Sequence, residues 1–214
     1  MIPAPVRYAR ASDVDHALEL LGEPDAKALA GGQSLLPVMK FRIARPSLVV
    51  DVSGLPLRGI EERAGQLHLG PLTTWGEIAV APELERPALA AITECARGIG
   101  DLQVRNRGTV GGSLAHADPA SDMPAVLLAL GATLTLRSPE GERAVTLADF
   151  LIGPFTSSLG TQELITDVVV PAPAPGSGSA YVSVEHPASG FALAGAAAKA
   201  LVGDVLGAPR AFRY

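Results

Sequence analysis

The sequence predicts an α+β fold in two lobes, and three features of the 214-residue chain lead to this class. Short apolar runs with strand-like alternation are interspersed with segments of helical period along the chain. A β-α-β-like unit occupies residues 1–55, and a second group of strands and helices follows over residues 56–175. The run PAPAPGSGS then marks a linker, and the remainder from residue 176 is too short to bury a core of its own.

The first lobe is predicted to contain two helices and two strands. Residues 12–21 form an amphipathic helix that begins at Ser12 with an acidic relative of the capping box. The segment AKALAGGQSLLPVMKFR, residues 26–42, predicts a strand, a tight turn at its glycine pair and a second helix with Ser34 as N-cap. SLVVDVSGL, residues 47–55, adds a fully apolar strand.

The second lobe is predicted from clearer local signals. GQLHLGPLTTWGEI gives a strand and then a helix whose capping box is Thr74 with Glu77. ELERPALAAITECARGIG continues with helical period to its terminal glycines, and DMPAVLLALG predicts a helix from Asp122 to a stop at Gly131. ATLTLRSPEGERAVTL predicts a hairpin, LADFLIG a short helix and QELITDVVVP a closing strand.

Composition excludes several kinds of partner. A formal charge of -5 without a Lys/Arg tract argues against nucleic acid or an anionic membrane as the main partner. The N-terminus has no basic segment followed by an apolar run, and no window reaches the roughly 18 apolar residues that span a bilayer, so we expect a cytoplasmic protein without membrane insertion. Cys95, the single cysteine, is predicted to be a buried structural thiol, and Trp75 and Phe41 are predicted to anchor the core.

Two glycine pairs, Gly31-Gly32 and Gly111-Gly112, each lie between an extended run and the expected start of a helix. Paired glycines let successive backbone N–H groups converge on an anion, and a helix N-terminus behind them adds partial positive charge. One such pair usually marks only a tight turn, but two pairs in lobes that can face each other favour a diphosphate. Neither pair fits Gly-x-Gly-x-x-Gly or a P-loop, which disfavours a Rossmann dinucleotide site.

The run RNRGTVGGSLAHADPASD also allows a metal-dependent hydrolase that uses His116, Asp118 and Asp122. This signal is weak, because no second histidine lies near in sequence and Asp122 suits a helix N-cap or a ribose hydroxyl acceptor better. Ser113 with His116 and Asp118 has the residue types of a nucleophilic triad, but three groups within one loop rarely acquire the required geometry. We therefore nominate no catalytic residue and no metal ligand.

Three segments, taken together in order, resemble the FAD-binding medium subunit of the molybdenum hydroxylases, the carbon-monoxide dehydrogenase and xanthine dehydrogenase group. They are ALAGGQSLLPVMKFRIARPSLVVDVSGL (28–55), LGPLTTWGEI (69–78) and RNRGTVGGSLAHADPASDMPAVLLALGATL (105–134). The similarity runs over residues 1 to about 195, and no one of the segments is specific by itself. In this family a molybdenum-cofactor large subunit oxidises the substrate, and a [2Fe-2S] small subunit passes the electrons on.

The resemblance implies a two-lobed FAD-binding domain of the vanillyl-alcohol-oxidase (PCMH) type over residues 1–175, with the cofactor between the lobes 1–55 and 56–175. Asp122 would accept from a ribose hydroxyl, and the Leu164 backbone and Tyr181 would lie near the flavin. Backbone N–H groups from both lobes would hold the pyrophosphate, and the residues implied are Ala30, Gly31, Gly32, Gln33, Ser34 and Leu35 in the first lobe and Thr109, Val110, Gly111, Gly112 and Ser113 in the second.

The implied function is electron transfer through FAD to an acceptor such as NAD, a quinone or oxygen, with no acid–base residue of the chain involved. Two departures from the family qualify this expectation. Glu185 stands where relatives often carry lysine, and the tail VGDVLGAPRAFRY does not resemble the family continuation. Residues 176–214 are therefore expected to be a truncated start of the C-terminal flavoprotein domain, which leaves a flavin-binding fragment without turnover as an alternative. Alanine content favours a helix in FALAGAAAKAL, whereas the resemblance implies a strand, which we adopt.

Overall fold

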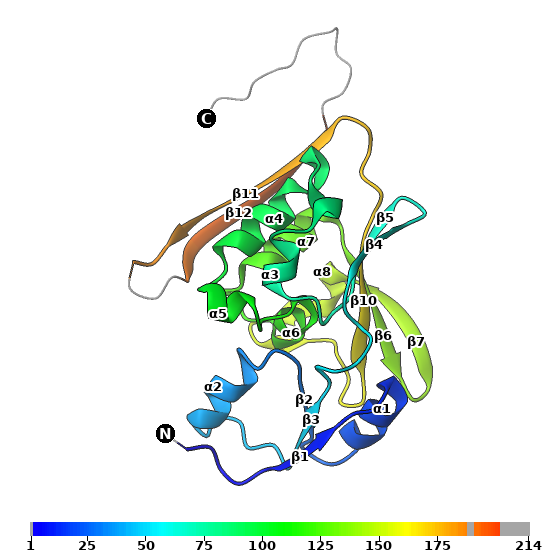
Figure 1. Cartoon of the computed structure of the whole chain (residues 1–214), viewed down its shortest axis with the longest axis vertical. Helices are drawn as coiled ribbons and strands as arrows, with labels where there is room; N and C mark the ends of the chain where they lie inside the picture. Colours follow the sequence, from blue (N-terminus) through cyan, green and yellow to red (C-terminus); the bar gives the residue numbers. More distant parts are fainter. Residues whose placement is uncertain (1, 188–190, 202–214) are drawn as a thin grey trace, which may run out of the picture.

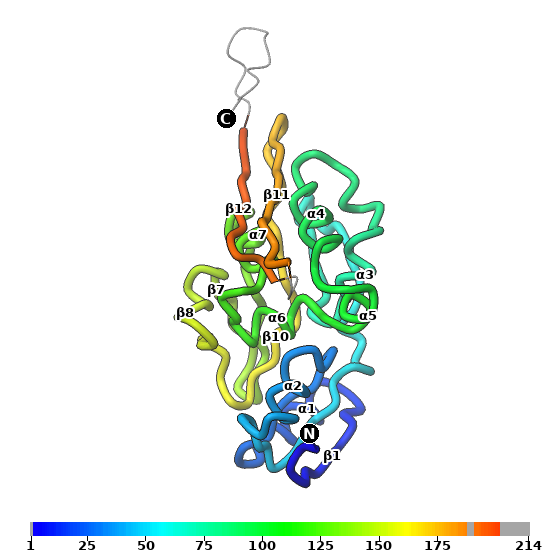
Figure 2. Tube along the Cα trace, turned by 90° about the vertical axis from the view of Figure 1, so that its left-hand side faces the viewer, coloured from blue at the N-terminus to red at the C-terminus, as the bar shows by residue number. Residues whose placement is uncertain are grey.

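The computed structural model describes residues 2–187 and 191–201 and shows an α+β protein. In Figures 1 and 2 a small lobe lies at one end of the molecule and a two-stranded hairpin at the other. A five-stranded sheet and a layer of helices fill the space between them. Among the described residues no helix is long and apolar enough to cross a membrane.

The small lobe is a parallel sheet of three strands in the order β1-β3-β2. Its elements are β1 (Arg7–Arg10), α1 (Val14–Leu21), β2 (Lys27–Leu29), α2 (Leu35–Lys40) and β3 (Leu48–Asp51). The N-cap of α1 is Asp13, whose carboxylate accepts from the His16 N–H at 2.8 Å, so the predicted cap at Ser12 is wrong by one residue. Ser34 is the N-cap of α2 as predicted, but its hydroxyl makes no capping hydrogen bond.

The larger lobe is built on an antiparallel sheet in the order β4-β5-β10-β6-β7. Its strands are β4 (Ile60–Arg63), β5 (Gln66–Leu69), β6 (Thr133–Ser138), β7 (Gly141–Thr146) and β10 (Leu164–Val170), with the small hairpin β8 (Leu151–Gly153) and β9 (Thr156–Ser157) beside them. Its helices are α3 (Trp75–Ile78), α4 (Ala90–Gly98), α5 (Leu102–Arg105), α6 (Val110–His116), α7 (Asp122–Leu130) and α8 (Leu147–Phe150), with short 3-10 turns at Pro82–Leu84 and Pro87–Leu89.

Several local predictions in this lobe are confirmed. Thr74 and Glu77 form the expected capping box, and the hairpin β6–β7 is in place. Helix α7 ends at Gly131, which has a φ of 75° and supplies the left-handed conformation of the C-cap. Helix α7 begins at Asp122 as predicted, and its N-cap is Ser121. Of the two roles expected for Asp122, that of N-cap is therefore wrong, and that of ribose acceptor stays a prediction.

The main core lies between the large sheet and the helices α4, α6 and α7. Trp75 and Cys95 are buried there as predicted, whereas Phe41 is 61% exposed, so its assignment to the core is wrong. Burial, with the Asp122 carboxylate nearby, raises the pKa of the Cys95 thiol, which makes it a packing group rather than a nucleophile. A second core joins the lobes, because Leu72 and Leu164 pack with the small-lobe residue Leu18.

Strand β10 contains a β-bulge at Thr166. The pairing with β6 shifts between Ile165 and Asp167, so the alternation of its side chains is reset at the bulge. Ile165 and Val168 consequently both face the main core although they are three residues apart. Asp167 stays on the outer face of the sheet.

The hairpin of β11 (Ser177–Glu185) and β12 (Ala192–Leu201) packs on α4 and α7. The alanine-rich segment is therefore a strand, because pairing with β11 overrides its helical propensity. The Ala91 N–H donates to the Ser179 hydroxyl at 3.1 Å, and the Tyr181 N–H donates to the Glu94 carboxylate at 2.8 Å. The predicted linker shortens to residues 171–176, since β11 already begins at Ser177. The tail of residues 202–214, whose sequence suggested truncation, lies outside the described residues.

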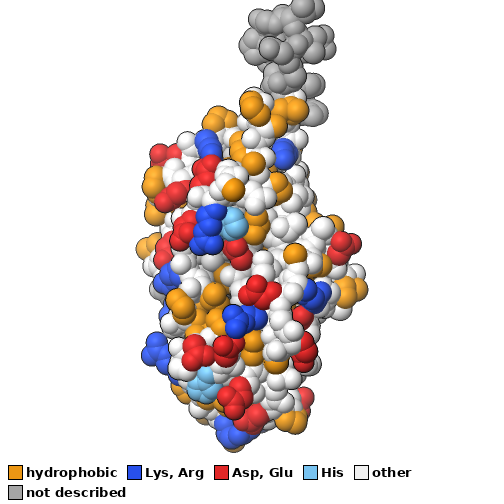
Figure 3. Space-filling model, turned by 90° about the vertical axis from the view of Figure 1, so that its right-hand side faces the viewer, with side chains coloured by type: hydrophobic (Ala, Val, Ile, Leu, Met, Phe, Trp, Pro, Cys, Tyr) orange, Lys and Arg blue, Asp and Glu red, His pale blue; other side chains and the backbone are white. Residues whose placement is uncertain are grey.

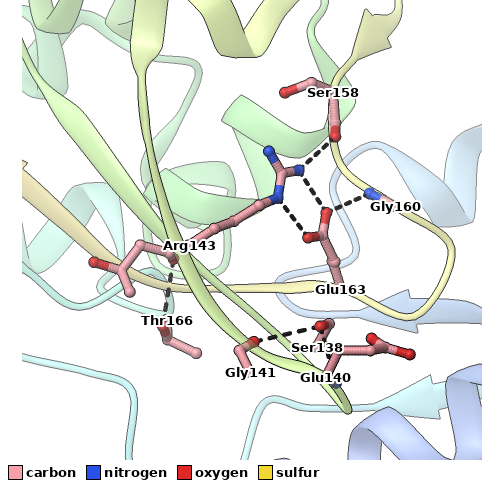
Figure 4. A network of polar contacts seen from close by, with 9 residues as sticks. Ser138, Glu140, Gly141, Arg143, Ser158, Gly160, Glu163 and Thr166 are labelled. Carbon is pink, nitrogen blue, oxygen red and sulfur yellow. Dashed lines mark hydrogen bonds and ion pairs between the residues drawn. The ribbon is translucent and has the colours of Figure 1, made fainter.

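An ion pair of Arg143 with Glu163 ties β7 to the loop that precedes β10 (Figure 4). The Arg143 guanidinium donates to both carboxylate oxygens of Glu163 at 2.7 Å and to the Ser158 carbonyl at 2.8 Å. The Gly160 N–H adds a further bond to Glu163 at 2.7 Å. The hydrogen bonds from Arg143 hold the pKa of Glu163 below its usual value.

Replacing Glu163 with glutamine should lower the free energy of unfolding by roughly 1 kcal/mol at pH 7, a modest figure because Arg143 is partly exposed to solvent. The pKa is lower in the folded than in the unfolded chain. The stabilisation is therefore present above the unfolded value of about 4.3 and is lost as the pH falls through the folded value. Urea unfolding at pH 7 and pH 3 should show the difference between wild type and variant shrinking at the lower pH.

The matched control is Glu140→Gln, because Glu140 is exposed and its carboxylate makes no hydrogen bond or ion pair among the described residues. This variant should change the free energy of unfolding by less than about 0.5 kcal/mol at either pH. An effect of Glu163→Gln that is equal at both pH values would contradict the assignment to the ionised pair.

Candidate functional site

The loop between β2 and α2 presents six successive backbone N–H groups that donate no hydrogen bond within the part of the chain that the structure describes. Gly32 has a φ of 78°, a left-handed conformation that glycine adopts without steric cost. Consecutive N–H groups on such a turn form a concave array that binds anions. The six donors belong to Ala30, Gly31, Gly32, Gln33, Ser34 and Leu35.

This loop contacts the larger lobe so closely that Gly31 cannot be any other residue without movement. A Cβ on Gly31 would lie 1.8 Å from the Arg107 carbonyl oxygen. A Cβ on Gly112, in α6, would lie 3.7 Å from the Ala30 Cβ. Figures 1 and 2 both place α6 beside the loop that leads into α2. The structure therefore brings the two predicted glycine segments together, one from each lobe.

The second segment contributes differently from what its sequence suggested, because Gly111 and Gly112 lie inside the first turn of α6 rather than before it. The N–H groups there are engaged within the fold, namely Val110 to the Thr73 carbonyl (3.1 Å), Gly111 to the Pro71 carbonyl (2.8 Å) and Ser113 to the Thr109 carbonyl (3.1 Å). This corrects the expectation that these three N–H groups would face a ligand. Within the described part of the chain, the Gly112 N–H donates only to the Thr109 hydroxyl, at 3.2 Å.

Gly111 and Gly112 are therefore glycines for different structural reasons. A Cβ on Gly111 would lie 2.4 Å from the Pro71 Cβ, so this glycine allows α6 to pack on the loop after β5. A Cβ on Gly112 would meet only the Thr109 hydroxyl and the Ala30 methyl within 4 Å. Gly112 therefore leaves open surface next to the unpaired N–H groups, which is what a phosphate needs for close approach.

Polar side chains connect α6 to the start of α7, and α7 to the hairpin of β11 and β12. The Ser113 and Ser121 hydroxyls are 2.6 Å apart, and the Tyr181 hydroxyl donates to Asp122 Oδ1. Burial and this hydrogen bond raise the pKa of Tyr181, so it stays a protonated donor. Among the described residues the Asp122 carboxylate accepts only this side-chain hydrogen bond, at Oδ1, so Oδ2 can accept another.

Leu164 lies at the junction of the lobes. It begins β10 opposite Arg137 of β6, and its side chain is buried in the core that the small lobe shares with the larger one. Its predicted proximity to a ligand would have to come from its backbone, because the side chain is fully committed to packing.

A small pocket at the same junction includes residues that the sequence reasoning missed. Arg58, Asn106 and Arg107 line it together with Ala30, Gly31 and Thr109. Asn106 and Arg107 directly precede the second glycine segment, so their place in the sequence was an available signal. No sequence signal pointed to Arg58. It lies in the connection between the lobes, outside both glycine segments, and reaches the junction from there.

The residues of the hydrolase and triad interpretations are not brought together. The His116 ring packs against Phe155 with centroids 5.3 Å apart, and Asp118 accepts from the Ala120 N–H at 2.9 Å. Ser113 pairs with Ser121 rather than with His116. Over residues 2–187 and 191–201, no three side chains of the metal-ligating types gather in one place. The geometry therefore supports neither interpretation.

The arrangement as a whole is suited to binding an anionic cofactor rather than to acid–base chemistry. Its donors are backbone N–H groups, which neutralise phosphate charge without lysine. An FAD pyrophosphate, with about two negative charges, matches both the donor array and the glycine-lined surface opposite it.

Comparisons with known proteins agree with this geometry. Residues 4–173 match the family described as the FAD binding domain in molybdopterin dehydrogenase. The chain is 42% identical over 200 residues to the 6-hydroxypseudooxynicotine dehydrogenase complex subunit alpha of Paenarthrobacter nicotinovorans, covering 92% of this chain and 67% of that one. It is 39% identical to the carbon monoxide dehydrogenase medium chain of Hydrogenophaga pseudoflava, covering 92% and 69%.

The solved structure of carbon monoxide dehydrogenase from Oligotropha carboxidovorans superposes with a TM-score of 0.91 at 36% identity, over 95% of this chain and 72% of that one. The chain thus spans about two thirds of the length of these relatives. Its fold is that of the FAD-binding PCMH type, and its cofactor is FAD. The chain belongs to the FAD-binding medium subunits of the molybdenum hydroxylases, whose members are components of FAD-containing oxidoreductases.

Proposed function

We propose that this chain is the electron-transfer subunit of a molybdenum hydroxylase. It takes electrons from a [2Fe-2S] small subunit, which receives them from a molybdenum-cofactor large subunit, and passes them to an acceptor such as NAD, a quinone or oxygen. The observation that carries the proposal is the array of six backbone N–H groups at Ala30–Leu35, which donate to no residue that the structure describes, with Ala30 next to the open surface of Gly112.

The chain's own residues bind and orient the cofactor in this proposal. The N–H groups of Ala30–Leu35 hold the pyrophosphate, and Gly112 lets it approach α6. The Thr109 and Ser113 hydroxyls lie beside that surface and can donate to the same group. FAD, when bound, supplies the redox chemistry, and the chain contributes binding, orientation and local charge.

Asp122 and Tyr181 act together at the ribose and flavin end of the proposed site. Tyr181 holds Oδ1 of Asp122, which fixes the carboxylate so that Oδ2 can accept from a ribose hydroxyl. Leu164 contributes through its backbone at the junction of the lobes. We assign residues 1–175 to the FAD-binding domain, with lobes 1–55 and 56–175, and residues 176–214 to the start of a C-terminal flavoprotein domain.

A visible spectrum of the purified chain tests the proposal most directly. Flavin bands at about 370 and 450 nm should appear, and denaturation should release FAD. Co-purification with iron–sulfur and molybdenum subunits then tests the place in an electron-transfer complex. A colourless protein that holds stoichiometric zinc would overturn the assignment and return attention to His116, Asp118 and Asp122.

A further inference from the structure

Two residues other than glycine adopt a left-handed backbone where α6 meets the hairpin of β8 and β9. Ala117, the C-cap of α6, has a φ of 49°, and Phe155, in the turn between β8 and β9, has a φ of 54°. The Phe155 N–H donates to the Ala117 carbonyl at 2.8 Å, which joins the two. A bulky residue rarely adopts a positive φ, because its Cβ crowds the backbone, whereas glycine does so freely. The turn therefore carries a phenyl ring although the ring strains its backbone.

The phenyl ring of Phe155 contributes little to the packing of the core. It is 61% exposed and belongs to neither hydrophobic core. Within the described part of the chain it forms an aromatic pair with His116, whose ring centroid lies 5.3 Å away at an interplanar angle of 58°. This tilted arrangement is favourable and leaves much of the phenyl ring open to solvent. Strained residues cluster at ligand sites, so an exposed ring held this way favours contact with a ligand.

Helix α6 connects this aromatic pair to the proposed pyrophosphate site. Gly112 and His116 are four residues apart, so they share one face of the helix at a separation of about 6 Å along its axis. Leu114 is buried in the core on the other side of the helix. The glycine end of the shared face borders Ala30, and its other end carries the ring of His116 against Phe155. A ligand that has its phosphates at Gly112 can therefore reach the aromatic pair.

The charged outer face of the large sheet differs from this surface, because its charges compensate one another. Figure 3 shows that basic and acidic side chains and histidine gather on the side of the molecule that carries this sheet. A cavity of about 230 Å³ lies there, and its charged residues are paired. Arg63 donates to Glu61 at 2.7 Å, and His68 lies 2.6 Å from Asp167. No ligand is needed to explain these charges, whereas the exposed ring at the end of α6 lacks an explanation within the chain.

We propose that Phe155, supported by His116, stacks on the isoalloxazine ring of FAD. The inference rests on the proposed function and extends the binding surface from the pyrophosphate along α6. The isoalloxazine is favoured over the adenine for two reasons. The pair is exposed, as a ring that passes electrons to an acceptor requires, and α6 contacts both β9 and β10, the strand that begins at Leu164. Stacking of a planar heterocycle on an aromatic side chain contributes substantially to affinity.

Calorimetric titration of the whole chain, freed of its cofactor, with FAD and with ADP-ribose tests the inference. ADP-ribose has the adenosine and the pyrophosphate but no isoalloxazine. Phe155→Ala should weaken FAD binding at least about fivefold and leave ADP-ribose binding unchanged. Phe155→Tyr keeps an aromatic ring and should bind both as wild type does. The matched control is Phe41→Ala, because Phe41 is also 61% exposed but lies in the small lobe at the end of α2, and this variant should bind both ligands normally.

Phe155→Gly separates the backbone from the ring. It should bind FAD as weakly as Phe155→Ala does, but its melting temperature should be higher than that of the alanine variant by about 2–4 °C, because glycine relieves the positive φ. FAD affinity unchanged in both variants, or ADP-ribose weakened as much as FAD, would overturn the stacking role of Phe155. In either case a wild-type chain that binds both ligands leaves the proposed function standing. A wild-type chain that binds neither FAD nor ADP-ribose would overturn the proposed function and this inference together.

Discussion

Replacing Gly31 with alanine should remove FAD from the protein and lower its free energy of unfolding by roughly 3 kcal/mol. The added methyl would lie 1.8 Å from the Arg107 carbonyl oxygen and 2.7 Å from the Arg107 carbonyl carbon. Both are backbone atoms, so no side-chain rotation relieves the overlap. The two lobes must separate locally, and the N–H groups of Ala30–Leu35 then lose their position opposite Gly112.

Flavin content per protein and urea unfolding measure the two effects together. The control is Gly153→Ala, because a Cβ on Gly153 would have no heavy atom within 4 Å and its φ is not left-handed. That variant should keep its FAD and its stability within about 0.5 kcal/mol. A Gly31→Ala protein that binds FAD as wild type does would show that the contact between Gly31 and Arg107 does not position the cofactor.

The glycine pairs show how much of the candidate site the sequence predicts. Their spacing and their position before helices predicted two segments that meet across the lobes, and the structure places Ala30 against Gly112. The same reasoning assigned identical roles to both pairs, which is wrong. Gly111 donates to the Pro71 carbonyl, a residue about forty positions away, and only the tertiary fold reveals that this N–H is already used.

The sequence predicts that each helix has a polar N-cap better than it predicts which residue serves as that N-cap. The box of Thr74 and Glu77 is correct because both partners are local, and the neighbouring Thr73 hydroxyl bonds to the Gly59 backbone instead. At α1 and α7 two adjacent residues can each serve as cap, Ser12 or Asp13 and Ser121 or Asp122, and the choice depends on packing beyond the helix. Asp122 is displaced from the cap and bonds instead to Tyr181, which arrives from a distant strand.

The cavity on the outer face of β4, β5 and β10 is a feature that no local sequence pattern predicts. Its charged residues come from the connection between the lobes, from β4, from β5 and from β10, and each is unremarkable in its own segment. The strand register and the bulge at Thr166 place His68 beside Asp167 although 99 positions separate them in the chain. Long-range pairing of this kind is set by the sheet order, which alternation within single strands does not specify.

Gly112→Val should separate cofactor binding from folding. The branched side chain would extend over the surface that faces Ala30 and the unpaired N–H groups, where the pyrophosphate is proposed to lie. We expect FAD affinity to fall at least about tenfold, because the phosphate could no longer approach α6. Its Cβ costs the Thr109 cap bond, worth about 1 kcal/mol, but valine has a higher helix propensity than glycine, so the melting temperature should change by only a few degrees.

Gly112→Ala completes this series, because its single methyl meets the Thr109 hydroxyl at 2.8 Å and the Ala30 methyl at an ordinary 3.7 Å. Rotation of the Thr109 hydroxyl relieves the first contact at the loss of its cap bond, which is worth about 1 kcal/mol. Both variants lose this cap bond, but only valine extends beyond Cβ over the surface that faces Ala30, so FAD affinity should fall much more in Gly112→Val than in Gly112→Ala. If both variants keep wild-type flavin content, α6 does not border the pyrophosphate, and the loop at Ala30–Leu35 must hold it without help from the second lobe.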